Sequence, residues 1–219
     1  MQDLVRCCRT MRLLVMLAAS WLAQAAGLQI ATAEPATAAD VQLAKTRLDA
    51  LGKTAKYRLD EAGTVTEISL EDGADLTADD VALFGRLTGL KKLQILNCRV
   101  LNDAMVGQLT GLGKLDTLAL TNSGITDVGV QQLAEAFPGL VELDLSSNTN
   151  MTGAALKMIA GLGSIERLTL LQNRFNDLNT RRLSKMPQLK TLDLRGNMEA
   201  GDMTMAVVGK LPHLTGLKH

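Results

Sequence analysis

The chain has 219 residues, enough for one or two ordinary domains or one short array of repeats. Hydrophobic residues make up 47% of it but aromatic residues only 2%, so aliphatic side chains must fill its core. Lys and Arg together number 23, as do Asp and Glu, and no basic patch carries interleaved aromatic residues, which argues against a protein that binds nucleic acid.

Residues 1–33 have the pattern of an export signal. Three arginines precede an almost entirely apolar run over residues 13–30, and residues 31–33 (Ala-Thr-Ala) fit a cleavage site with small residues. Either Met1 or Met11 is an acceptable start for such a signal. We predict an exported protein (periplasmic, in the cell envelope or secreted) that is not inserted in a membrane once the signal is cleaved. The alternative is an uncleaved anchor, which would barely span a bilayer core of about 30 Å.

The next segments are predicted to lead into a larger array. Residues 34–40 are interpreted as a short flexible linker. Residues 41–62 are interpreted as an amino-terminal cap, made of an amphipathic helix followed by a first strand. The apolar positions behind this interpretation are Val41, Leu43, Ala44, Leu48, Leu51, Tyr57 and Leu59.

An apolar triplet recurs from residue 65 onward. An apolar residue is followed by a second three places later and a third two places after that, and successive repeats begin 24 or 25 residues apart. About six repeats are complete, and a seventh begins with Leu214 and Leu217. The triplets are Val65/Ile68/Leu70, Leu90/Leu93/Ile95, Leu115/Leu118/Leu120, Leu140/Leu143/Leu145, Ile165/Leu168/Leu170 and Leu189/Leu192/Leu194. Repetition at this period indicates a solenoid.

A further residue, eight places after each start, completes the pattern. These turn residues are Gly73, Cys98, Ser123, Asn148, Asn173 and Asn197. The whole unit resembles the L-x-x-L-x-L-x-x-N/C-x-L signature of the leucine-rich-repeat family over residues 63–219. The Ile-Thr-Asp-x-Gly-Val sequence from Ile125 is similar to the cysteine-containing subclass with helices on the convex side, in its bacterial exported form. The resemblance implies an α/β solenoid, with a curved parallel sheet on the concave side, that binds proteins.

The repeat also predicts local structure on physical grounds. The fourth and sixth positions of each unit point inward together, because strand side chains alternate between faces. An Asn at the turn can bond backbone groups that the bend leaves unpaired. Thr126 and Asn176 should begin helices. Units that start at Leu90, Leu140 and Leu189 carry one extra residue after the turn, so their helices should begin one residue later.

Positions three, five, seven and eight of each repeat are expected on the concave face. Leu96 and Leu171 stand out there as apolar residues at positions predicted to be exposed; they are either anchors for a partner or ordinary isolated leucines. Glu142 and Asp144 are expected to be solvated. The candidate protein-binding residues are Lys92, Gln94, Leu96, Thr117, Thr121, Glu142, Asp144, Ser146, Arg167, Thr169, Leu171, Asp193 and Arg195. The two arginines should form weak surface pairs with the nearby carboxylates.

The repeat carries no recognisable catalytic motif. His213 and His219 have no partners spaced as metal ligands, and Cys98 lies at a structural turn position. We therefore predict a non-catalytic scaffold, without a cofactor or metal, that binds a protein of unknown identity. The alternative is a self-associating structural component of the cell envelope, a homo-oligomer joined through the open carboxy-terminal edge at Leu217.

Overall fold

The computed structural model describes residues 36–219. The predicted signal at residues 1–33 lies outside the described residues. Among the described helices, none is long and apolar enough to cross a membrane.

Eight strands form one sheet in chain order. The first pair is antiparallel, and every later pair is parallel. Equivalent positions of neighbouring repeats lie side by side, as in the pairing of Leu93 with Leu118. The strands are β1 (Ala55–Leu59), β2 (Val65–Leu70), β3 (Lys92–Ile95), β4 (Thr117–Leu120), β5 (Glu142–Asp144), β6 (Arg167–Thr169), β7 (Thr191–Asp193) and β8 (Gly216–Lys218).

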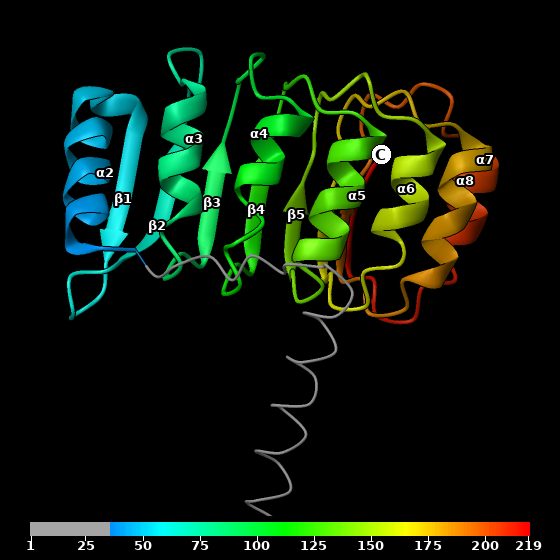
Figure 1. The fold of residues 1–219 in the computed structure, drawn as a ribbon. Coiled ribbons are helices and arrows are strands. Elements are labelled where there is room, and N and C mark those ends of the chain that lie inside the picture. Colours follow the sequence, from blue (N-terminus) through cyan, green and yellow to red (C-terminus); the bar gives the residue numbers. More distant parts are fainter. Residues whose placement is uncertain (1–35) are drawn as a thin grey trace, which may run out of the picture. The chain divides into compact units, whose positions relative to one another are not determined.

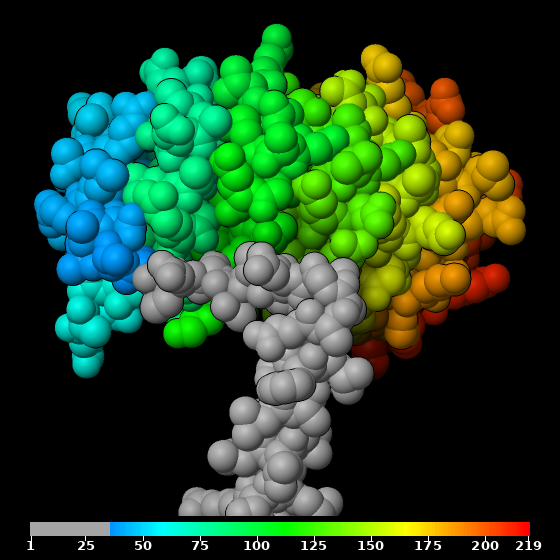
Figure 2. Space-filling model, in the orientation of Figure 1, coloured from blue at the N-terminus to red at the C-terminus, as the bar shows by residue number. Residues whose placement is uncertain are grey.

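The helices form a second layer on one side of this sheet, and Figure 2 shows their outer surface. They are α2 (Ala38–Ala50), α3 (Ala78–Gly85), α4 (Asp103–Gln108), α5 (Asp127–Ala136), α6 (Gly153–Ile159), α7 (Asp177–Thr180) and α8 (Asp202–Val208), with short 3-10 helices η1 (Gly52–Thr54) and η2 (Arg181–Lys185). The alternation of strand and helix confirms the predicted α/β repeat solenoid (Figure 1). We refer to the sheet face turned away from the helices as the concave face.

The core lies between the two layers. All members of the six complete triplets are buried, as predicted from their spacing. The residues that close each repeat are buried as well: Leu87, Leu112, Phe137, Leu162, Met186 and Leu211. Leu214 is partly buried and Leu217 is 43% exposed, because β8 has a neighbouring strand on one side only.

The predicted shift in helix start is confirmed. Thr126 and Asn176 are N-caps eleven residues after their repeat starts, whereas Asn102 and Thr152 are N-caps twelve residues after theirs. In α8 the N-cap is Gly201, also twelve residues after the repeat start. The helix residue that points into the core shifts by one position in the same units. It is Leu133 or Leu183 where the helix begins earlier and Leu109 or Ile159 where it begins later, and all four are buried.

Carboxylates at the starts of α4, α5 and α7 each accept hydrogen bonds from the start of the next α-helix. Asp127 accepts hydrogen bonds from the backbone N–H and the hydroxyl of Thr152, at 2.8 and 2.5 Å. Asp103 does the same for Thr126, and Asp177 accepts from the N–H groups of Gly201 and Thr204. Each carboxylate therefore satisfies N–H groups that would otherwise be left unpaired at the start of the following helix.

The start of the array corrects two predictions. The first helix begins at Ala38, within the predicted linker 34–40, because Thr37 and Asp40 form a capping box. Leu43 and Leu59, which were assigned to the apolar face of the predicted cap 41–62, are 55% and 41% exposed. In this helix it is Ala44 and Leu48 that pack into the core, at 0% and 1% exposure.

Candidate protein-binding face

Two rows of side chains run across the concave face at right angles to the strands. Position three of β3 to β7 forms one row, and position five forms the other, because the strands pair in register. The first row contains Lys92, Thr117, Glu142, Arg167 and Thr191. The second contains Gln94, Ala119, Asp144, Thr169 and Asp193. The residue between them in each of these strands is a core leucine, so strand alternation positions both rows.

In the position-three row, a positive and a negative side chain pair with each other. Arg167 Nε lies 2.8 Å from Glu142 Oε2, and both side chains are well exposed. In solvent such a pair is worth about 0–1 kcal/mol. The predicted surface pair of Arg167 with a nearby carboxylate is present.

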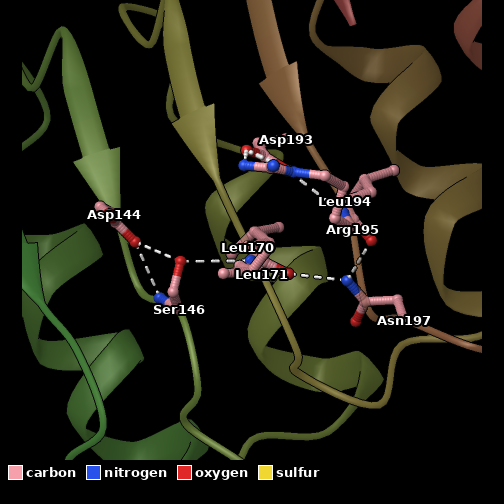
Figure 3. A network of polar contacts seen from close by, with 8 residues as sticks. All are labelled: Asp144, Ser146, Leu170, Leu171, Asp193, Leu194, Arg195 and Asn197. Carbon is pink, nitrogen blue, oxygen red and sulfur yellow. Dashed lines mark hydrogen bonds and ion pairs between the residues drawn. The ribbon is translucent and has the colours of Figure 1, made fainter. Parts of the chain in front are cut away.

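The carboxyl ends of β5 and β7 carry two related arrangements of side chains (Figure 3). Asp144 Oδ1 accepts hydrogen bonds from the backbone N–H and the hydroxyl of Ser146, at 2.9 and 2.5 Å. The Ser146 hydroxyl oxygen in turn accepts from the N–H of Leu171, at 3.2 Å. After β7, Arg195 takes the place of the serine and forms a salt bridge to Asp193, at 2.7 Å. Asp193 therefore has a cationic partner, whereas Asp144 forms no ion pair with any described residue.

This difference shifts the pKa values of Asp144 and Asp193 in opposite directions. Burial raises the pKa of Asp144, the charges of Asp193 and Glu142 add to the effect, and the bonds from Ser146 only partly offset it. Burial would also raise the pKa of Asp193, but the hydrogen bonds and charge of Arg195 hold it below its ordinary value. Asp144 is therefore only partly exposed and not freely solvated as expected, because Ser146 in the following turn bonds its carboxylate.

A hollow of about 1030 Å³ lies over this end of the concave face. It brings together eight of the candidate residues: Leu96, Thr121, Asp144, Ser146, Thr169, Leu171, Asp193 and Arg195. The other five, Lys92, Gln94, Thr117, Glu142 and Arg167, do not line it.

Three candidates are less exposed than expected. Leu96 and Leu171 were predicted as exposed apolar residues but are partly buried, because they lie in the turn directly after a short strand. Ser146 is only 6% exposed, since its hydroxyl is held between Asp144 and the backbone of Leu171. Both leucines still line the hollow.

The rim of the hollow includes residues that were not singled out as candidates. Asn97, Asn122, Ser147 and Gln172 have φ between 48° and 61°, in the left-handed region. All of them occupy position eight of their repeats, where the chain turns out of the strand. Asn tolerates this conformation better than most residues. The two asparagines at this position could therefore have indicated from the sequence that the chain turns here.

The turn residues behind the rim hold it in place, as predicted for asparagine. Asn148 Nδ2 donates to the carbonyls of Leu120 and Leu145, at 2.7 and 2.9 Å, and the Ser123 N–H donates to its Oδ1 at 2.8 Å. Asn197 makes the corresponding bonds to Leu170 and Leu194.

The described residues contain no group of three or more His, Cys, Asp and Glu side chains that could hold a metal ion. Cys98 is buried, and burial raises the pKa of its thiol. Its environment is therefore that of a packed core residue and not of a reactive thiolate.

This geometry defines a repeat solenoid with a polar hollow at one end of its parallel strands. Residues 138–198 match the family described as Leucine rich repeat. The chain is also similar to Tsukushi from Gallus gallus, at 33% identity over 123 residues, covering 52% of this chain and 33% of that protein. The chain thus matches about one third of the length of this relative. These matches support the leucine-rich-repeat family, which the repeated signature of the array resembles.

Proposed function

We propose that this chain is a non-catalytic scaffold that binds a protein in the hollow of its concave face. Leucine-rich-repeat domains generally act as protein-binding scaffolds, and the match to this family supports that general role here. The hollow, with its mixture of polar side chains and partly buried leucines, is the site that we assign to the partner.

The single observation that carries this assignment is the state of Asp144. Burial raises the pKa of its carboxyl group, and no described cation forms an ion pair with it. Asp144 is partly buried, and a charge withdrawn from water without a counter-ion is unfavourable. A partner that brings a donor group or a cation to this carboxylate would remove that cost, while Leu96 and Leu171 offer apolar contact nearby.

The proposal includes export, on the sequence pattern of residues 1–33. The partner is then a protein of the periplasm, the cell envelope or the medium. A self-associating envelope component is the competing account, and the experiment below separates the two.

The test is affinity capture from envelope and secreted fractions with the full chain as bait. The variant Leu96→Ser/Leu171→Ser changes the hollow. The control Leu43→Ser/Val128→Ser changes two aliphatic residues away from it, which are 55% and 56% exposed. Circular dichroism verifies that both variants fold. The proposal expects a captured protein that the control retains and the hollow variant loses. Equal capture by both variants, or recovery of the chain's own copies alone, contradicts it.

A further inference from the structure

A second hollow lies on the helix side of the array, between the α7–η2 segment and α8. Its volume is about 600 Å³. Helices α7 and α8 are neighbours in the helical layer (Figure 1). This helix-side groove is separated from the concave face by the core, so a ligand bound in it would leave the first hollow free.

The groove is lined by cations without carboxylates. Arg181, Arg182 and Lys185 contribute to its wall, and no Asp or Glu does. None of the three forms a salt bridge with any residue in the described part of the chain. Asp177 begins the same helix, but its carboxylate is occupied by the N–H groups of Gly201 and Thr204. The groove therefore presents positive charge that residues 36–219 do not neutralise.

The repeat extends this charge to the neighbouring helices. Lys157 of α6 and Arg181 each lie five residues after their N-caps, Thr152 and Asn176. Equivalent positions of adjacent repeats lie next to each other in a solenoid. The same reasoning places Lys210 in the row of Lys185, since both lie nine residues after their N-caps. Two exposed carboxylates, Glu199 and Asp202, lie near the start of α8, and neither lines the groove.

Apolar side chains border the same groove. Leu178, at the second helical position of α7, lines the groove and is 62% exposed. Met203 has the same position in α8 and is 53% exposed, but it does not line the groove. Val207 of α8 is partly buried in the wall. Large apolar side chains left in water beside a hollow are typical of an interaction site.

We propose that the helix-side groove binds an acidic segment of a partner protein that also presents an apolar side chain. Carboxylates of the segment would lie against Arg181, Arg182 and Lys185, and its apolar residue would contact Leu178 and Val207. The recessed shape favours a narrow peptide segment over a planar lipid surface, which would touch the rim and leave the hollow unfilled. Attraction between the charges orients the segment and speeds its association, and the apolar contact slows its dissociation.

The experiment uses the full chain and a fluorescent synthetic peptide of alternating Glu and Leu pairs, with binding measured by anisotropy at low and high salt. Matched probes replace every Glu by Lys, or every Leu by Ser. The groove variant is Arg181→Gln/Arg182→Gln/Lys185→Gln. The control Lys53→Gln/Lys91→Gln/Lys114→Gln removes the same charge from exposed lysines elsewhere. Vesicles of phosphatidylcholine with phosphatidylserine form a separate arm, and thermal unfolding verifies that each variant is folded.

The proposal expects the Glu–Leu peptide to bind more tightly than either matched probe and to weaken as salt screens the charges. The groove variant should lose about tenfold in affinity, from three largely exposed charge contacts, and the control should stay within about twofold of the parent. Absence of peptide binding by the parent, or an equal loss in both variants, overturns the proposal. Binding to the vesicles in place of the peptide also overturns it, since the surface would then be a lipid contact.

Discussion

The backbone N–H of Asn148 donates a 2.7 Å hydrogen bond to the side-chain oxygen of Asn173, one repeat further along the chain. Both residues are fully buried. The amide nitrogen of the same Asn173 donates to the carbonyl of Leu145, at 2.8 Å. One side chain thus supplies an acceptor and a donor to the preceding repeat and fixes the turn that shapes the concave hollow.

Replacing Asn173 by Ala should lower the free energy of unfolding by about 2–4 kcal/mol, because the buried N–H of Asn148 loses its acceptor and a small cavity forms. Urea denaturation followed by circular dichroism measures the change. Asn150→Ala is the matched control, since Asn150 is exposed, and should stay within about 0.5 kcal/mol of the parent. Similar losses in the two variants would mean that the turn asparagine is not structural.

Leu143→Ala in the central strand β5 should cost about 2–5 kcal/mol, because Leu143 is 1% exposed and its neighbours in β4 and β6 pack against it. Several repeats should unfold together, since each buries its apolar face only against its neighbours. The denaturation midpoint and hydrogen exchange across β4 to β6 report both effects. Val128→Ala, at a 56% exposed position, is the control. An unchanged midpoint for Leu143→Ala would contradict the placement of this residue in the core.

Asp144→Asn should stabilise the fold at neutral pH. The folded state raises the pKa of Asp144, so the unfolded chain ionises first as pH rises, and the stability of the parent falls between the unfolded and the folded pKa. The variant lacks this penalty, and its amide oxygen can still accept from Ser146. Its advantage should be absent well below pH 4 and grow toward neutral pH, as followed by denaturation across that range. An advantage that does not change with pH would show that the carboxyl is not desolvated.

Asp177→Asn should have the opposite dependence on pH. The hydroxyl of Thr204, followed by the N–H groups of Gly201 and Thr204, lowers the pKa of Asp177 in the folded state. The ionised group therefore stabilises the fold above its unfolded pKa, and this contribution disappears as pH falls through the lower folded pKa. Thermal unfolding should show the variant less stable than the parent at neutral pH, with the gap closing in acid. A gap of constant size would refute this assignment.

The sequence was sufficient to predict the features that repeat by residue type. The spacing of the leucines located the core positions of the strands, and the extra residue in the units that start at Leu90, Leu140 and Leu189 located the shifted helix starts. The contacts between repeats were harder to predict, because the partner of Asp127 is a backbone N–H group 25 residues away. An acidic residue at the first helical position looks the same whether it faces water or caps the following helix.

The candidate site was only partly predictable for the same reason. Strand alternation placed both rows of the concave face correctly. It could not show that the turn after β5 covers Asp144, or that Leu171 is partly buried, because these depend on how the chain leaves the strand. The exposure of Leu43 likewise follows from which side of α2 packs against the core and not from its hydrophobicity.

The most direct test of the central claim is site-specific photo-crosslinking of the full chain in the cells from which the sequence comes. A photoreactive residue replaces Thr121 or Thr169 in the concave hollow, or Thr110 or Gln131 on the helix side, where both are exposed. The account predicts that the two concave positions link to one and the same foreign protein and that the two helix-side positions do not. Crosslinks from the helix-side positions alone, or only between copies of the chain, would contradict it.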